Sequence, residues 1–239
     1  MRDEIAVLIA AGLGTRMQPL TLKVPKPLVK VKNMPMIETM IRGLNRRGVK
    51  SIYVVVGYLG EQFQYLSQKY ENVNIIYNDE YRSKNNISSV YAAREVLGER
   101  DCFICEADIF VTDPSIFDVE LHNSCYYGKM VEGHSEDWVF DQDGAGRITR
   151  VGKVGDNKYN MCGVCFLRAA DAAIISQAVI EAYRQPELCA QKYWDEMVNQ
   201  NLDKIYMTVH PVEAGQIVEI DSEAELAQVD PDYRRWNLK

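Results

Sequence analysis

Two glycines and two cationic side chains near the start of the chain form a pattern suited to binding a nucleoside triphosphate. Residues 8–38 read LIAAGLGTRMQPLTLKVPKPLVKVKNMPMIE. Gly12 and Gly14 follow an apolar run, and a loop without side-chain bulk lets backbone N–H groups approach phosphates. Arg16 and Lys26 would place two cations where negative charge develops during phosphoryl transfer. The residues that we expect to contact phosphates in this loop are Ala10, Ala11, Gly12, Gly14, Thr15, Arg16 and Lys26.

Two aspartates, Asp108 and Asp221, each come directly after a segment that has the pattern of a strand. Carboxylates at strand ends of an α/β sheet face the ligand crevice, and Mg²⁺ needs one or two of them together with phosphate oxygens. Asp108 belongs to the sequence Glu106-Ala107-Asp108. An alternative for Asp221 is that it caps the N-terminus of a following helix, because Asp is common there.

The glycine pair, the arginine, the P-x-T spacing and the P-K-P-L segment occur together and in order. This combination resembles the signature of the sugar-nucleotide pyrophosphorylase and cytidylyltransferase superfamily. It lacks the G-K-[ST] end of a P-loop and the third glycine of a dinucleotide-binding motif. The resemblance implies that Arg16, Lys26 and Asp108 are catalytic and that Asp108 and Asp221 hold Mg²⁺. A non-catalytic subunit with the same fold is the alternative, but all four of these residues are present.

Further segments resemble one family within this superfamily, the bacterial lic-type CTP:phosphocholine cytidylyltransferases. They are the Asn-Asn-x-x-Ser-x-Tyr segment at 85–91, the sequence V-G-Y at 56–58, a tryptophan at 138, Y-W-D at 193–195 and E-I-D-S at 219–222. The resemblance covers nearly the whole chain and implies CTP as the substrate. Asn86 and Ser89 would lie at the cytosine edge, although these residue types are equally suited to loops and helix caps. The other expected nucleotide contacts are Gly57, Tyr58 and Glu106.

The resemblance also implies an acceptor for the CMP group of CTP, with phosphocholine as the first candidate. The family implies that Trp138 and Tyr193 face the quaternary ammonium of phosphocholine, because such an ion has no N–H to donate and aromatic faces attract it; both rings could instead pack in the core. Met130 and Lys192 depart from the family pattern. 2-Aminoethylphosphonate is therefore the alternative acceptor, and a sugar 1-phosphate is a further one. A primary ammonium would prefer partners such as Glu132, Asp137 or Glu219, and Glu219 is the acidic residue that we expect in the acceptor site.

Composition limits the classes of partner. The net charge of −7 and the pI near 5.1 disfavour a general nucleic-acid-binding protein. The first apolar run is too short for a signal peptide or a membrane span, so we expect a cytoplasmic enzyme without membrane insertion. Two C-x-x-C pairs lie in strand-like runs, where residues three apart point to opposite faces, so we expect no zinc site there. The sequence leaves the oligomeric state open.

The elements that must position these residues follow a βαβ pattern. We expect an α/β protein with a Rossmann-like nucleotidyltransferase fold and a mixed, mostly parallel central sheet flanked by helices. The expected domain is a single one at 1–239, with a nucleotide-binding half at 1–115 and an acceptor-binding half at 116–239. The expected strands are Ile5–Ala10, Ser51–Gly57, Val73–Tyr77, Cys102–Ala107, Tyr126–Val131, Trp138–Asp141, Ile148–Val151, Met161–Leu167, Ile205–Val209 and Gln216–Ile220. The expected helices are Met36–Arg47, Glu61–Tyr70, Ser88–Leu97, Ala170–Arg184, Tyr193–Gln200 and a last one beginning near Ser222.

Overall fold

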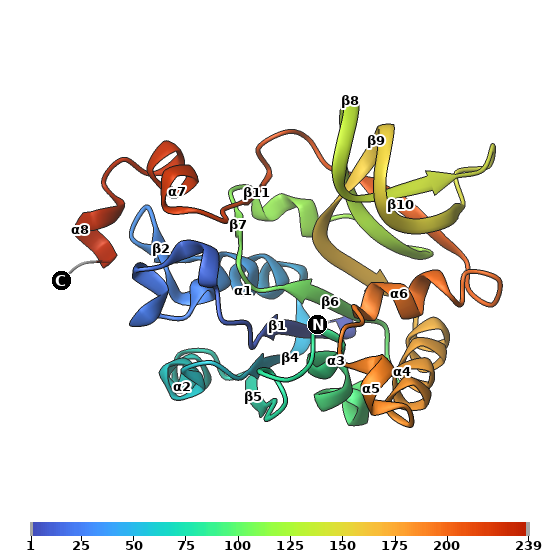
Figure 1. Cartoon of the computed structure of the whole chain (residues 1–239), viewed down its shortest axis with the longest axis horizontal. Helices are drawn as coiled ribbons and strands as arrows, with labels where there is room; N and C mark the ends of the chain where they lie inside the picture. The colour runs from blue at the N-terminus through green and yellow to red at the C-terminus, as the bar shows by residue number, and fades with distance from the viewer. Residues whose placement is uncertain (1, 238–239) are drawn as a thin grey trace.

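A seven-stranded sheet with the order β10-β8-β9-β6-β1-β4-β5 forms the centre of the computed structural model, which describes residues 2–237 (Figure 1). Strands β6, β1, β4 and β5 are parallel neighbours, β9 is antiparallel to both β6 and β8, and β10 is parallel to β8. The mixed, mostly parallel sheet expected from the sequence is confirmed. Its strands are β1 (Arg2–Ala10), β4 (Val49–Val56), β5 (Val73–Tyr77), β6 (Cys102–Glu106), β8 (Ser124–Gln142), β9 (Ile148–Leu167) and β10 (Met207–Pro211).

Helices cover both faces of this sheet, which explains why its central strands are apolar without alternation. On β1, Leu8 belongs to the core that includes Leu44 of α1, whereas Val7 belongs to the core on the other face, with Ile175 of α4. The helices are α1 (Met36–Arg47), α2 (Gln64–Lys69), α3 (Ile87–Ala92), α4 (Ala169–Tyr183), α5 (Pro186–Cys189), α6 (Trp194–Asn199), α7 (Glu223–Val229) and α8 (Tyr233–Asn237). None of the helices within residues 2–237 combines the length and apolar character that crossing a bilayer requires.

Residues 126–167 differ from the sequence-based expectation of four short strands. The structure has two long strands instead, β8 of 19 residues and β9 of 20 residues, which form a bent hairpin that extends from one end of the molecule (Figure 1). Register shifts interrupt the pairing near 131–134 and 135–139, and residue Val139 pairs with both Gly152 and Asn160. The sequence predicted breaks between short strands where the structure has these irregular positions. A bulge disrupts the alternating pattern of side chains without ending the strand.

Two small sheets complete the fold beside the main one. Strands β2 (Lys30–Val31) and β3 (Met34–Pro35) form a hairpin before α1, and β7 (Ile109–Val111) pairs antiparallel with β11 (Ile217–Glu219). The sequence reading missed β7, whose three residues directly follow the turn after β6. Through this short strand, residues 217–219 lie beside residues 109–111.

A buried ion pair ties the end of α1 to the sheet. The Arg47 guanidinium is 1% exposed, and its Nε donates to Glu4 Oε2 at 2.6 Å. Its Nη1 donates to the carbonyl oxygens of Phe117 at 2.8 Å and Val119 at 2.6 Å. A charge at this depth is tolerated only because these partners replace the water that it loses.

We therefore expect Arg47→Ala to lower the free energy of unfolding by about 3–5 kcal/mol, because the substitution leaves the Glu4 carboxylate buried without its guanidinium. Arg46→Ala is a matched control, since the neighbouring Arg46 lies at the surface and pairs there with Asp118. Its expected effect is within about 1 kcal/mol. Chemical denaturation of both variants measures the difference, and equal losses would contradict this assignment.

Candidate active site

A loop with three short 3₁₀ helices connects β1 to the hairpin before α1. These are η1 (Thr15–Met17), η2 (Leu20–Leu22) and η3 (Lys26–Leu28). Gly14 has a φ of 61°, and a Cβ there would lie 2.9 Å from Lys26 Cβ and 3.1 Å from Thr21 Cγ2. Glycine is therefore required at this position both for the left-handed backbone and for the close approach of the second half of the loop.

Side chains from outside the first turn hold this loop in place. Thr21 Oγ1 donates to the Gly14 carbonyl oxygen at 2.8 Å, and Tyr58 Oη donates to the Thr21 carbonyl oxygen at 2.9 Å. The Tyr58 amide also donates to Ala11 O. A Cβ on Gly57 would meet the Tyr81 side chain at 2.6 Å. Tyr58 thus supports the loop, and Gly57 allows Tyr81 to approach closely; the nucleotide contacts that the sequence predicts for both residues stay predictions.

The pairing of β7 with β11 explains why two distant aspartates meet. Glu219 lies opposite Ile109 in this antiparallel pair, so Asp221 follows one strand at the place where Asp108 precedes the other. Lys26 Nζ lies 2.8 Å from Asp108 Oδ2 and 2.6 Å from Asp221 Oδ1. Arg16 Nη1 lies 2.6 Å from Asp221 Oδ2. The loop and both acids therefore form one charged cluster.

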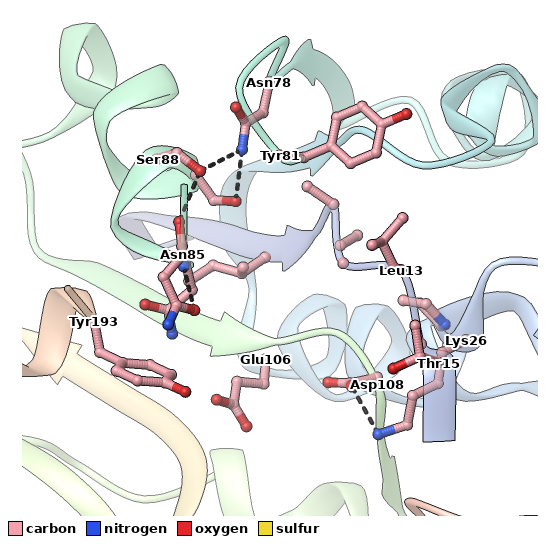
Figure 2. Close-up of a pocket in the computed structure, with 18 of the residues that line it drawn as sticks. Leu13, Thr15, Lys26, Asn78, Tyr81, Asn85, Ser88, Glu106, Asp108 and Tyr193 are labelled. Carbon is pink, nitrogen blue, oxygen red and sulfur yellow. Dashed lines mark hydrogen bonds and ion pairs between the residues drawn. The ribbon is translucent and has the colours of Figure 1, made fainter. Parts of the chain in front are cut away.

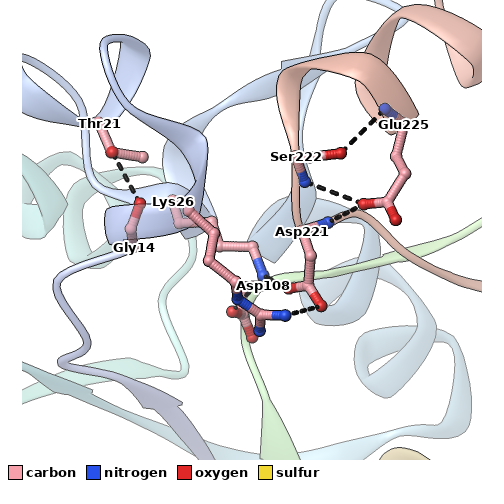
Figure 3. Close-up of polar contacts among 8 residues, drawn as sticks. Gly14, Thr21, Lys26, Asp108, Asp221, Ser222 and Glu225 are labelled. Atoms are coloured by element: carbon pink, nitrogen blue, oxygen red, sulfur yellow. Dashed lines mark hydrogen bonds and ion pairs between the residues drawn. The ribbon is translucent and has the colours of Figure 1, made fainter.

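Asp221 does not cap the helix that follows it. The N-cap of α7 is Ser222, whose Oγ accepts from the Glu225 amide, while Glu225 Oε2 accepts from the amides of Asp221 at 2.7 Å and Ser222 at 2.9 Å (Figure 3). This capping box fixes the backbone at Asp221 without using its side chain. The carboxylate of Asp221 is therefore available to the cluster.

Burial and charge act in opposite directions on the cluster. Burial would lower the pKa of Lys26, but Asp108 and Asp221 outweigh it and hold that pKa above its ordinary value. Burial would raise the pKa of Asp221, but Lys26 and Arg16 hold it below its ordinary range. For Glu106 and Glu219, burial raises the pKa, and the neighbouring carboxylates push it further in the same direction. The site thus has an excess of acidic groups.

A cavity of about 410 Å³ runs from this cluster along the carboxyl ends of the parallel strands (Figure 2). Lys26 and Asp108 lie at one end of the view in Figure 2, and Asn78 and Ser88 at the other. Most of the site residues expected from the sequence line this cavity: Ala10, Ala11, Gly12, Gly14, Thr15, Arg16, Lys26, Asn86, Ser89, Glu106, Asp108, Tyr193, Glu219 and Asp221. Gly57, Tyr58 and Trp138 are not among the lining residues.

The far end of the cavity is organised by an asparagine that the sequence reading missed. Asn78 Nδ2 donates to Ser88 Oγ at 2.8 Å and to Ser89 Oγ at 3.2 Å. Asn78 directly follows β5, so its place at a strand end was a signal that could have identified it. Asn86 Oδ1 accepts from the Trp194 amide at 3.0 Å and thereby links α3 to α6. The other missed lining residues are Ile9, Leu13, Pro27, Tyr81, Lys84, Asn85 and Ser88.

A second cavity, which we call the side cavity, adjoins the first through Glu106 and Glu219, which line both. It has a volume of about 160 Å³ and reaches the bent hairpin, where Asp137, Trp138 and Asn160 line it. Glu132 and Met130 do not line it. Of the three acids that the sequence offered for a primary ammonium, the structure therefore brings Asp137 and Glu219 to this cavity.

The aromatic pair expected at the acceptor is present, but a lysine already lies against it. The rings of Trp138 and Tyr193 meet edge to face with centroids 5.5 Å apart. Lys153 Nζ lies 5.9 Å from the Trp138 centroid and 5.5 Å from the Tyr193 centroid. The sequence showed Lys153 only as one of several lysines in this half of the chain, because its place beside the two rings depends on the bend of the hairpin.

The two carboxylates bound to Lys26 are suited to a divalent cation that is shared with phosphates. Both contact a single nitrogen atom, so both lie within reach of one small ion. Within residues 2–237, no group of three or more His, Cys, Asp or Glu side chains is arranged to hold a metal on its own. Mg²⁺ commonly takes one or two carboxylates and completes its shell with water and phosphate oxygens. The residues present therefore fit a magnesium ion that binds together with a nucleotide.

Comparison with known proteins agrees with this geometry. Residues 5–125 match the family described as nucleotidyl transferase. A 2-aminoethylphosphonate cytidylyltransferase from Lancefieldella rimae is 48% identical over 95% of this chain and 92% of its own length. A choline-phosphate cytidylyltransferase from Streptococcus pneumoniae is 33% identical over 97% of this chain and 99% of its own.

The solved structure of CTP:phosphocholine cytidylyltransferase from Streptococcus pneumoniae superposes with a TM-score of 0.87 at 32% identity, and it covers 96% of this chain and 99% of that one. The resemblance inferred from the sequence is confirmed by these matches. They extend over both the glycine loop and the bent hairpin, so they concern the whole cavity and not only its nucleotide half. The chain is therefore an enzyme and belongs to the nucleotidyl transferase family.

Proposed function

We propose that the enzyme transfers CMP from CTP to 2-aminoethylphosphonate and releases pyrophosphate, with Mg²⁺ as cofactor. The observation that supports the transfer chemistry most directly is the contact of one buried ammonium, Lys26, with Asp108 and Asp221 beside the glycine loop. CTP as the donor is supported by cytidylyltransferases that match nearly the whole chain. The same geometry would serve any nucleoside triphosphate, so the base requires its own test.

The loop residues would bind the triphosphate through backbone N–H groups, with Arg16 and Lys26 neutralising its charge. The base would lie at the far end of the cavity, beside Asn86 and Ser89, whose amide and hydroxyl groups can match its donors and acceptors. The acceptor would enter through the side cavity, so that its phosphonate meets the α-phosphate near Glu106 and Glu219. The base of CTP and the incoming acceptor are thus assigned to different cavities.

In the reaction, a phosphonate oxygen attacks the α-phosphorus in line, and the bond between this phosphorus and the bridging oxygen of pyrophosphate breaks. The nucleophile is already an anion at neutral pH, so no base needs to remove a proton and no covalent enzyme intermediate is needed. Catalysis then consists of orienting two anions and neutralising their charge. Lys26 is suited to this because its ammonium is held above its ordinary pKa and is almost fully buried.

Asp108 and Asp221 would hold the Mg²⁺ ion. When bound, the ion supplies neutralisation of negative charge on the phosphate oxygens. Lys26 would keep the two carboxylates together before the nucleotide arrives, because it contacts both of them. Arg16 would leave Asp221 for the phosphates, since its side chain is 72% exposed and is free to turn.

Two observations support 2-aminoethylphosphonate as the acceptor: the side chains of the bent hairpin and the sequence identities of the relatives. Phosphocholine is the acceptor that the sequence favoured first, but the ammonium of Lys153 lies over both aromatic rings that a quaternary ammonium would need. The side cavity offers Asp137 and Glu219 to a primary ammonium. The relative named for 2-aminoethylphosphonate is 48% identical, against 33% for the one named for choline phosphate.

A panel of substrates tests this proposal through the rate of pyrophosphate release. Each of the four nucleoside triphosphates is combined with 2-aminoethylphosphonate, phosphocholine and glucose 1-phosphate, with Mg²⁺ present. We expect CTP with 2-aminoethylphosphonate to give the highest kcat/KM, exceeding phosphocholine by roughly tenfold or more, as expected for a charge-assisted hydrogen bond that only one acceptor makes. A higher kcat/KM with phosphocholine or glucose 1-phosphate would refute the proposed acceptor, and preference for another nucleotide would refute the proposed donor.

A further inference from the structure

One buried polar atom in the side cavity has no partner among the described residues. Asn160, on β9, is 9% exposed and lines this cavity, and its Oδ1 accepts no hydrogen bond within residues 2–237. Buried carbonyl oxygens are nearly always satisfied in native proteins, because leaving one without a donor is unfavourable. Because Asn160 lines the side cavity, the unsatisfied acceptor that it carries indicates a donor that arrives with the substrate.

The orientation of this amide is determined by its neighbours. Asn160 Nδ2 donates to Ser135 Oγ at 2.7 Å and lies 3.3 Å from Asp137 Oδ2. The oxygen and nitrogen of an asparagine are otherwise interchangeable by a flip of the amide. A carboxylate oxygen can only accept, so the nitrogen must face Asp137 and the oxygen must face away from it. The hairpin therefore holds Oδ1 as an acceptor.

The charges that line the side cavity favour a cationic donor. Three carboxylates line it, from Glu106, Asp137 and Glu219, against one lysine, Lys129. A neutral amide at position 160 adds an acceptor without adding a fourth carboxyl group. It also donates to Asp137, which a carboxylate at this position could not do.

We propose that Asn160 is a specificity-determining residue, whose amide oxygen accepts a hydrogen bond from the primary ammonium of the acceptor substrate. This inference rests on the proposed function and extends it. A primary ammonium has three N–H donors, whereas a quaternary ammonium has none and would leave the oxygen unsatisfied. Asp137 has two roles in this arrangement: it orients the amide and attracts the cation.

The test uses two acceptors that differ only at the nitrogen atom: 2-aminoethylphosphonate, with three N–H groups, and its N,N,N-trimethyl analogue, with three N-methyl groups instead. The measured quantity is the ratio of kcat/KM for the two acceptors, with CTP saturating. We expect Asn160→Leu to lower this ratio by roughly 10- to 100-fold, the effect of losing one hydrogen bond to a charged group. The loss should appear in the KM for 2-aminoethylphosphonate more than in kcat.

Two further variants separate recognition from a structural role. Asn160→Asp keeps the oxygen but loses both hydrogen bonds that Nδ2 donates, so we expect it to retain the preference for the primary ammonium even if it unfolds at lower temperature. Ser135→Ala removes a partner of Nδ2 and leaves the oxygen in place, so its ratio should remain within about threefold of wild type. If Asn160→Leu proves unstable, the comparison of Asn160→Asp with the wild-type enzyme still decides between the two roles.

Each outcome has a separate meaning. If the wild-type enzyme releases no pyrophosphate with either acceptor, the proposed function fails. If the wild-type enzyme prefers 2-aminoethylphosphonate and Asn160→Leu keeps the same ratio, the proposed function stands and the role of Asn160 is refuted. Equal loss of the preference in Asn160→Leu and Asn160→Asp would also refute it, because that result would assign the effect to the hydrogen bonds that hold the hairpin.

Discussion

Replacing Lys26 by methionine is expected to lower kcat for pyrophosphate release by roughly 10²- to 10³-fold, the range found when one positioned donor is removed from a developing charge. The ammonium of Lys26 is 7% exposed, so water cannot easily replace it at the phosphates. Methionine keeps most of the aliphatic stem and removes only the charge. Steady-state kinetics at saturating CTP and acceptor measure the effect.

The fold should tolerate this change. Lys26 contacts Asp108 and Asp221, whose side chains are 33% and 19% exposed, so water can reach both acids after the substitution. Arg16 still pairs with Asp221. The thermal unfolding temperature of Lys26→Met is therefore a necessary companion measurement, since a large decrease would assign the lost activity to stability.

Lys23→Met is the matched control for this prediction. Lys23 lies in the same loop, is exposed, and does not line the main cavity. We expect its kcat to stay within about twofold of wild type, because a solvated charge outside the cavity contributes little to a buried site. A Lys26→Met enzyme as active as Lys23→Met would remove Lys26 from the mechanism.

The sequence predicted the parallel part of the fold well because that part obeys local rules. The expected helix at 36–47 and the expected strand at 73–77 have the observed bounds. In α1, the apolar residues recur with helical spacing, and Gly48 ends the helix in the left-handed conformation, with a φ of 86°. Local propensity, hydrophobic pattern and capping agree for this element, so the prediction did not depend on the tertiary structure.

The bent hairpin could not be predicted in this way. Its outer part has little buried surface, so no apolar alternation reveals the strand, and its register depends on bulges. Asn160 lines the side cavity, and Lys153 lies against the rings of Trp138 and Tyr193, because of where this bend places them. The sequence therefore predicted an acceptor-binding half at 116–239 but could not place the side chains to which we assign the choice of acceptor.

The proximity of Asp108 and Asp221 could not be predicted from the sequence for a different reason. Each of them follows a segment with the pattern of a strand, which predicted that its carboxylate faces a ligand. Only the family resemblance predicted that the two aspartates act together. The structural reason is β7, a strand of three residues that is too short to leave a pattern. Lys26 and Asp221 are 195 residues apart in the chain, and no spacing rule extends that far.

Asp221→Asn should raise the Mg²⁺ concentration for half-maximal pyrophosphate release by at least about tenfold, a loss already typical of residues that only support a metal ligand. The substitution keeps the shape of the side chain and removes its charge. Its backbone should stay in place, because Glu225 holds the amides of Asp221 and Ser222. Asp118→Asn is the control, since Asp118 pairs with Arg46 at the surface, and its Mg²⁺ dependence should equal that of wild type.

The order of binding follows from the same geometry. Two carboxylates alone make a weak site for Mg²⁺, and in this structure both are engaged by Lys26. We therefore expect calorimetry to detect tight Mg²⁺ binding only in the presence of a non-hydrolysable CTP analogue, whose phosphates complete the shell and draw Lys26 and Arg16 away. Asp221→Asn should weaken this binding, whereas Lys26→Met should not, because it frees both acids. Tight Mg²⁺ binding to the wild-type enzyme without nucleotide, or an unchanged affinity in Asp221→Asn, would mean that the ion is held elsewhere.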